Sequence, residues 1–234
     1  MCYPESIKIC VSVPGNRLGY EWNIIKKLLM HRSTYLEVRI DMGGLEWHML
    51  EKLKEIRKKL ILTIRYKDEG GKFKYNEGRR FKIFESLIEI HPLYIDIEYK
   101  SMIFDNVLNK ASSEDIGVIA SYHNMLRTPS LTYLKKIYRN LSTLEKVDIV
   151  KIVTMANSYL DNLTVLNLFF EYDVCKKPLI AFCMGKYGRI SRIVAPFLGS
   201  FFTYVSFNKF KTGPGQFSLD EFNRIMRLII NEWT

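Results

Sequence analysis

The sequence lacks the features that would divide the chain, anchor it in a membrane or direct it out of the cell. No stretch rich in proline, glycine and serine interrupts the 234 residues, so we expect one domain over residues 1–234. No apolar run is long enough to span a bilayer, and the N-terminus has no basic segment followed by the apolar core of a signal peptide. The sequence therefore predicts a cytoplasmic protein with no membrane partner.

Metal-binding and dinucleotide-binding signatures are also missing. The four cysteines and four histidines are scattered and lack the spacing of a metal site. Three of the cysteines lie in or near apolar runs, where a reduced thiol packs as a small hydrophobic group. The stretch 14–19, PGNRLG, follows the first apolar run but matches a dinucleotide fingerprint poorly. We therefore expect no metal and no dinucleotide cofactor.

The chain has few acidic residues relative to basic ones. Its 25 Asp and Glu residues are outnumbered by 35 Lys and Arg residues, which gives a net charge of +10. Such an excess attracts small anionic substrates or nucleic acid. The basic and aromatic stretch 65–75 favours nucleic acid weakly, whereas clusters such as 52–59 are more typical of a solvated helix face. A nucleic-acid-binding module is therefore a minor alternative, and we expect no nucleic-acid partner.

Apolar runs rich in β-branched residues alternate along the chain with amphipathic helical patterns. Nearly continuous apolar runs are typical of strands buried on both faces of a parallel sheet. The predicted strands are 7–13, 35–41, 60–65, 93–99, 117–123, 148–155, 178–184 and 202–207. The predicted helices are 20–31, 45–58, 76–90, 130–141, 159–170, 189–197 and 219–230, while 101–109 is marginal as a helix.

Eight strand-helix units at intervals of roughly 30 residues predict a closed (β/α)₈ barrel, a TIM barrel. An open doubly wound sheet is the alternative, although it would usually carry a glycine-rich turn after its first strand. In a barrel, the informative residues are polar side chains near the carboxyl ends of the strands, because barrel enzymes build their sites there.

Lys151 stands in the middle of the apolar strand 148–155, where a charged residue is unexpected. Side chains alternate along a strand, so Ile149, Lys151 and Val153 share one face. A buried lysine must pair with a carboxylate or lose its charge, and a neutral amine on a rigid strand can condense with a ketone or aldehyde to an imine. The residue is thus either a structural ion-pair partner or a Schiff-base nucleophile.

Charges on four other strands follow the same alternation. In 35–41 the charged residues Glu37, Arg39 and Asp41 share one face, and the apolar residues between them should meet the helices. The same alternation places further polar residues inside the barrel: Thr63, Arg65, Asp96, Glu98, Ser121 and His123. Opposite charges that face one another are what burial requires, so Asp96 and Glu98 fit a structural role as well as a functional one.

His123 ends its predicted strand and precedes Asn124. A single histidine is more often structural, but one at a strand end in a barrel that also contains a buried lysine is a candidate general acid and base, because histidine titrates near neutrality. A lysine together with a histidine suggests carbonyl chemistry through an imine, followed by proton abstraction from the adjacent carbon.

Taken together, these segments resemble the type I 3-dehydroquinate dehydratase family over nearly the whole chain and in the same order. No single stretch is decisive, but their joint order is specific. The matching stretches are 8–13 (KICVSV), 37–41 (EVRID), 63–65 (TIR) with 69–71 (EGG), 121–123 (SYH), 148–152 (DIVKI), 184–185 (MG) with 188–192 (GRISR), and 213–216 (GPGQ).

The resemblance implies a (β/α)₈ barrel, usually a homodimer, that dehydrates 3-dehydroquinate to 3-dehydroshikimate in the shikimate pathway of aromatic amino acid biosynthesis without metal or cofactor. Lys151 would form the Schiff base, His123 would act as general acid and base, and Glu37 would assist His123. Arg192 would hold the substrate carboxylate. The other substrate-binding positions implied are Ser12, Arg39, Arg65, Thr212 and Gln216, with the loop 211–217 covering the substrate.

Four departures from the family pattern stand out. The chain begins almost at its first strand, so we expect no N-terminal hairpin under the barrel. Asn124 stands where an acidic residue is common, and Thr212 stands where serine is common. The segment 101–109 suggests a trimmed fourth helix.

The nearest enzymatic alternative is a class I Schiff-base aldolase acting on a sugar phosphate. Such an enzyme also uses a strand lysine, but it needs a phosphate site made of backbone amides near the last two strands. Gly185 and Gly188 are the candidates for such a site.

Overall fold

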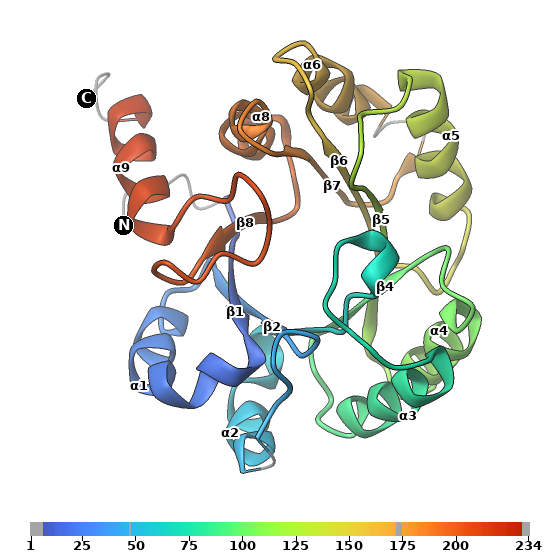
Figure 1. Ribbon diagram of the computed structural model, residues 1–234, viewed down its shortest axis with the longest axis vertical. Helices are drawn as coiled ribbons and strands as arrows, with labels where there is room; N and C mark the ends of the chain where they lie inside the picture. Colours follow the sequence, from blue (N-terminus) through green and yellow to red (C-terminus); the bar gives the residue numbers. More distant parts are fainter. Residues whose placement is uncertain (1–6, 47, 172–174, 231–234) are drawn as a thin grey trace.

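The computed structural model describes residues 7–46, 48–171 and 175–230, and it confirms the predicted barrel. Eight parallel strands form a ring with helices outside it (Figure 1). The strands are β1 Ile9–Pro14, β2 Thr34–Arg39, β3 Leu60–Thr63, β4 Tyr94–Glu98, β5 Gly117–Asn124, β6 Ile149–Met155, β7 Leu179–Met184 and β8 Thr203–Ser206.

The ladder runs without interruption from β7 round to β1 and then to β8. Between β7 and β8, the amide of Phe201 donates to the carbonyl of Leu179 at 2.8 Å. This bond joins the segment before β8 to the start of β7, so the seam of the ring lies between these two strands. No helix in the described part of the chain is both long enough and apolar enough to cross a membrane.

The helices follow the predicted pattern, and some of them are shorter than predicted. The α-helices are α1 Leu18–Leu29, α2 Met49–Glu55, α3 Glu77–Ile88, α4 Phe104–Ser113, α5 Leu131–Ser142, α6 Asp161–Leu166, α8 Arg189–Val194 and α9 Leu219–Ile230. Three of the predicted helical segments end in 3₁₀ turns, at Arg57–Lys59 after α2, Asn167–Glu171 after α6 and Ala195–Leu198 after α8.

Polar side chains cap the N-termini of α3 and α9. The Asn76 side chain accepts from the amide of Arg79 at 2.9 Å and begins α3. Before α9, the Ser218 hydroxyl accepts from the amide of Glu221 while the Glu221 carboxylate accepts from the amide of Ser218, which is a capping box.

The prediction that the fourth helix is marginal was wrong. Helix α4 is a regular helix of ten residues, Phe104–Ser113. Its buried residues Phe104, Val107, Leu108 and Ala111 follow the three- and four-residue spacing of one helical face. The range 101–109 cut off the second half of this pattern and included the turn before it, so the segment looked too weak to be a helix.

Two hydrophobic cores result from the alternation along the strands. Val150 and Ile152 of β6 belong to the large core between the sheet and the helices. Ile149 and Val153 belong to a smaller core inside the ring. Lys151 lies between them in sequence and points inward with them, as the alternation predicted.

Aromatic rings fill the amino-terminal end of the ring. Phe202 lies at its centre, with ring centroids 4.9 Å from Tyr35, 6.1 Å from Tyr94 and 4.8 Å from Phe201. The expected absence of an N-terminal hairpin concerns residues that lie outside the described ones. In the described part of the chain, these rings close the floor of the barrel.

We predict that Phe202→Ala destabilises the fold by about 3 kcal/mol, because the change removes a fully buried ring and leaves a cavity among aromatic neighbours. Urea unfolding would measure the loss. The matched control is Phe170→Ala, since Phe170 is 75% exposed and should change stability little. Equal losses in both variants would contradict a floor held together by Phe202.

Candidate active site

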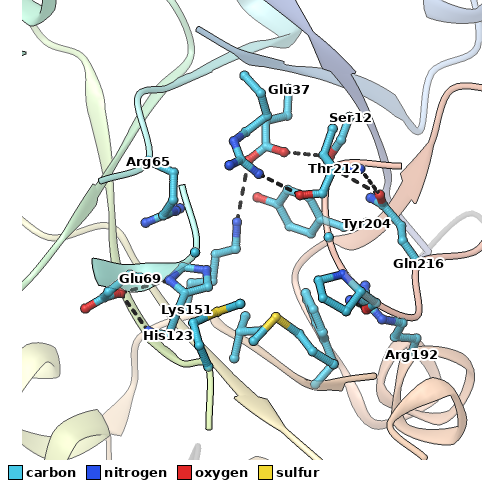
Figure 2. A pocket seen from close by; sticks show the side chains of 18 residues that line it. Ser12, Glu37, Arg65, Glu69, His123, Lys151, Arg192, Tyr204, Thr212 and Gln216 are labelled. Atoms are coloured by element: carbon cyan, nitrogen blue, oxygen red, sulfur yellow. Dashed lines mark hydrogen bonds and ion pairs between the residues drawn. The ribbon is translucent and has the colours of Figure 1, made fainter. Parts of the chain in front are cut away.

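All nine residues that the sequence singled out for a site line one pocket at the carboxyl ends of the strands (Figure 2). They come from β1, β2, β5, β6, α8, the end of β3 and the loop between β8 and α9. The nine are Ser12, Glu37, Arg39, Arg65, His123, Lys151, Arg192, Thr212 and Gln216. Parallel strands bring their carboxyl ends together, which is why residues so far apart in sequence meet here.

Lys151 occupies the bottom of this pocket and is almost completely buried. Its Nζ donates to Asp96 Oδ2 at 2.8 Å and lies 3.6 Å from Glu37 Oε1. The ammonium is therefore paired with a carboxylate, as burial of its charge requires.

Asp96 itself is fully buried on β4 and accepts from three side chains. Besides Lys151, Arg65 Nη2 donates to it at 2.6 Å and the Ser121 hydroxyl at 2.7 Å. Burial alone would raise the pKa of Asp96, but the charges of Arg65 and Lys151 lower it well below the usual range. Arg65 also pairs with Glu98 at 3.0 Å, so both of its terminal nitrogens have partners within the protein.

Glu37 is held in place by hydroxyl groups. Ser12 Oγ donates to it at 2.5 Å and Thr63 Oγ1 at 3.0 Å. This carboxylate faces Lys151. The carboxylate that contacts His123 is a different one, Glu69.

Arg39 connects the strands to the loop above them. Its Nε and Nη2 donate to the two oxygens of Asp41, at 2.9 and 2.8 Å. Its Nη1 donates to the carbonyl of Thr212 at 3.0 Å. Two of its three nitrogens thus fix the side chain, and the third holds the loop.

His123 and Glu69 form a close pair at one side of the pocket. Glu69 Oε2 lies 3.0 Å from His123 Nδ1 and accepts from the His123 amide at 2.7 Å. Burial raises the pKa of Glu69 to about 8 despite the nearby Arg65. Burial, Arg65 and Lys151 together lower the pKa of His123 well below its usual range. The histidine is thus a neutral imidazole, and Nε2 is the nitrogen available to a ligand.

Arg192 is a buried cation without a carboxylate partner in the described part of the chain. Its Nη2 donates to the carbonyl of Pro214 at 3.1 Å, and its Nε has no hydrogen-bond partner there. Burial is the main reason that the pKa of Arg192 falls to about 9, so the group is still charged at neutral pH. A guanidinium in this state is suited to bind a carboxylate of a ligand.

The loop between β8 and α9 closes one side of the pocket, as the predicted range 211–217 indicated. The Gln216 side-chain oxygen accepts from the amide and the hydroxyl of Thr212, at 2.9 and 3.1 Å. Gly215 has φ +73°, and a Cβ there would lie 2.3 Å from the carbonyl of Gly185. Glycine is therefore required where this loop passes the end of β7.

Glu69, Asp96 and Tyr204 also belong to the site but were not among the nine. Asp96 was visible as an inward charge, although the sequence left its role open. Glu69 lies in the 3₁₀ turn Lys67–Glu69 after β3, before Gly70 at φ +81°. The EGG stretch was part of the matching pattern, but its contact with His123 depends on the path of that turn. Nothing in the pattern of β8 marked Tyr204.

Comparison with known proteins gives a consistent result. The family model for type I 3-dehydroquinase matches residues 9–232. The chain belongs to this family. By family it is an enzyme, a carbon–oxygen lyase. Among curated relatives, 3-dehydroquinate dehydratase of Pyrococcus abyssi is 38% identical over 205 residues, which are 88% of this chain and 92% of the relative. The protein of the same name from Dehalococcoides mccartyi is 34% identical over 198 residues, 84% of this chain and 86% of the relative.

Solved structures of the type I 3-dehydroquinase family share the fold. The enzyme of Aquifex aeolicus has a TM-score of 0.74 at 29% identity, over 96% of this chain and 99% of that one. The type I enzyme of Clostridium difficile has a TM-score of 0.79 at 24% identity, over 95% of this chain and 92% of that one.

The Glu69–His123 pair makes stability depend on pH. In the unfolded chain these groups titrate near 4.5 and 6.5. Below about 6.5 the two groups act in opposite directions. Folded Glu69 keeps a proton that the unfolded chain loses, whereas folded His123 loses its proton at a lower pH than the unfolded chain does. From about pH 6.5 to about pH 8, Glu69 is the one of these two groups that binds more protons in the folded chain than in the unfolded chain. Its contribution to stability therefore falls as the pH rises.

We predict that Glu69→Gln removes this fall. Relative to the variant, the native protein should lose roughly 1–2 kcal/mol of unfolding free energy between pH 6.5 and pH 8. Urea unfolding at the two pH values measures it. Glu51→Gln, at an exposed position, is the control and should retain the native pH dependence. The same slope in Glu69→Gln and the native protein would show that Glu69 does not hold the proton.

Proposed function

We propose that the protein dehydrates 3-dehydroquinate to 3-dehydroshikimate through an imine on Lys151, in the shikimate pathway. The observation that carries the proposal is the pocket itself, which combines a buried strand lysine, a neutral histidine and an arginine that lacks a carboxylate partner in the described chain. Each part matches one requirement of the reaction: a nucleophile for the ketone, a base for the adjacent carbon and a cation for the substrate carboxylate.

The strand register places the two reacting groups at different heights. Lys151 of β6 lies opposite Ser121 of β5, whereas His123 lies opposite Val153. The histidine is therefore one inward position nearer the mouth than the lysine, on the neighbouring strand. A substrate whose C3 carbonyl reaches down to Lys151 would place its C2 beside His123.

The proposed steps use these residues in turn. The Lys151 ammonium gives up a proton, and the free amine attacks the C3 ketone. Two of the three ammonium protons leave with the ketone oxygen as water, which gives the iminium. His123 takes the proton from C2, because the neighbouring iminium lets the electron pair delocalise as an enamine. The enamine then expels the C1 hydroxyl, which leaves as water with the proton from His123. Hydrolysis of the product imine returns the amine.

The other pocket residues would bind and order the substrate. Arg192 would hold its carboxylate, and Glu37, Arg39, Arg65 and Gln216 would face its ring hydroxyls, with Ser12 and Thr212 supporting Glu37 and Gln216. We also expect a homodimer and a cytoplasmic location.

The aldolase alternative finds little support near the last two strands. The amide of Gly185 donates to the carbonyl of Pro214 at 3.3 Å, and the amide of Gly188 donates to the carbonyl of Gly185 at 3.2 Å. The backbone donors that a phosphate would need are thus already engaged. We therefore favour a substrate with a carboxylate over one with a phosphate.

We predict that borohydride reduction in the presence of 3-dehydroquinate places a single adduct on the peptide that contains Lys151. Lys151→Ala should lose both the adduct and turnover, whereas Lys82→Ala, at an exposed position of α3 outside the pocket, should retain both. Intact mass and peptide mapping provide the measurement.

A histidine variant separates imine formation from proton transfer. His123→Ala should still form the adduct but turn over roughly 10²–10⁴-fold more slowly, because it lacks the general acid and base. An adduct with a sugar phosphate but none with 3-dehydroquinate would instead support the aldolase. No adduct with either would overturn the imine mechanism.

We predict that Arg192→Ala raises KM roughly 10- to 100-fold, because the substrate carboxylate loses its charged partner. Steady-state kinetics measure the effect. Arg189→Ala is the matched control: it lies one turn away on α8, pairs with Glu221 and does not line the pocket, so its KM should stay near the native value. An unchanged KM in Arg192→Ala would place the carboxylate elsewhere.

A further inference from the structure

The Lys151 ammonium rests against an aromatic ring that the proposed steps leave unused. Its Nζ lies 3.9 Å from the centroid of the Tyr204 ring, in addition to its contacts with Asp96 and Glu37. Figure 2 shows Tyr204 reaching from β8 into the middle of the pocket. Tyr204 is only 5% exposed. The nitrogen is thus held by two carboxylates and the face of one ring.

The ring has little freedom to move. Tyr204 stands opposite Cys10 of β1 in the strand register. Its ring meets Phe202 of the floor edge to face, at 6.4 Å and 83°, and Phe182 at 6.2 Å and 43°. The position of the ring under Lys151 is therefore fixed by the packed interior of the barrel.

The hydroxyl of Tyr204 does not explain why a tyrosine stands here. In the described chain it has no hydrogen-bond partner by distance and angle, and the thiol of Cys10 is beside it. Burial raises the pKa of Tyr204 well above its usual range, so the side chain is a neutral phenol. Whatever the residue does to a nearby cation, it does through its ring face and not as an anion.

We propose that Tyr204 is a positioning residue that holds the Lys151 nitrogen through its positive charge. The face of an aromatic ring attracts a cation and has no such attraction for a neutral amine. The inference rests on the proposed role of Lys151 as the nucleophile. In that reaction the nitrogen is charged in the resting ammonium and in the iminium states, and it is uncharged in the attacking amine and in the enamine.

Tyr204 therefore favours the two charged states and raises the pH at which the free amine becomes available. It also holds the charged nitrogen beside Asp96 and Glu37. Other groups that face this nitrogen contribute to the same balance, and the variants below leave them in place: Asp96 and Glu37, Arg65, His123 and Cys10.

The test measures the pH dependence of the Lys151 amine without any substrate. The native protein and its variants are treated with formaldehyde and borohydride at a series of pH values, and methylation of the Lys151 peptide is followed by mass spectrometry. The midpoint is the pH at which methylation of Lys151 reaches half of its maximum. Tyr204→Leu removes the ring, and this midpoint should fall by about one pH unit. Tyr204→Phe keeps the ring and should keep the native midpoint.

Phe202→Leu is the matched control for packing. It removes a neighbouring ring that contacts Tyr204 and does not line the pocket, so the midpoint should stay at the native value. If Tyr204→Leu does not fold, Tyr204→Met fills more of the space and should show the same fall.

An unchanged midpoint in the ring-free variant would overturn the inference. An equal fall in Tyr204→Phe would assign the effect to the hydroxyl, and an equal fall in Phe202→Leu would assign it to packing; either result overturns the role of the ring face. The methylation assay contains no 3-dehydroquinate, so it is independent of turnover. If the midpoint falls only in the ring-free variant and the native protein shows no dehydratase turnover, this inference is supported and only the proposed function is overturned.

Discussion

The polar interior of this barrel depends on one interaction, the acceptance of three hydrogen bonds by the buried carboxylate of Asp96. Its donors are Lys151, Arg65 and Ser121. A buried carboxylate is costly unless its lone pairs are satisfied, and here two cations and a hydroxyl satisfy them. In return, Asp96 holds the lysine nitrogen at the bottom of the pocket.

Further ion pairs connect the residues around Asp96 to others outside the pocket, and one buried cation of the pocket has no carboxylate partner in the described part of the chain. Arg65 also pairs with Glu98, and Glu98 pairs with Arg80, a fully buried arginine of α3 that also contacts Glu77. Arg39 pairs with Asp41. In the described part of the chain, Arg192 is the buried cation of the pocket that has no such partner. An anionic substrate would provide the missing partner of Arg192. The charge of Arg192 therefore indicates the substrate class better than the charges that are already paired with carboxylates.

The sequence predicted the inward charges because alternation along a strand is a local rule. Glu37, Arg39, Lys151 and His123 each belong to a strand whose other face is apolar, so their direction follows from their neighbours. The contact of Glu69 with His123 follows from no such rule, because it depends on a turn with a glycine at positive φ. Arg80 was missed for a related reason: a charged residue on a helix normally faces solvent, and only the tertiary contact with Glu98 shows that this one does not. Helix α4 was misjudged because its apolar face was read over too short a window.

Strand β6 shows how the two ends of the barrel work together. Ile149 packs in the aromatic floor, Lys151 reaches the ion-pair layer, and Val153 borders the pocket. The aliphatic part of the Lys151 side chain therefore packs on the apolar floor, while its nitrogen pairs with the carboxylates of Asp96 and Glu37. The low polarity of the floor strengthens these ion pairs. In the proposed reaction the nitrogen is positively charged as the ammonium and as the iminium, so Asp96 regains a cationic partner after each neutral stage. The proton taken from C2 moves to His123 and then to the leaving hydroxyl, and the substrate carboxylate matches Arg192. No charge has to cross the apolar floor, so the chemistry is compatible with a rigid barrel and needs movement only in the loop above it.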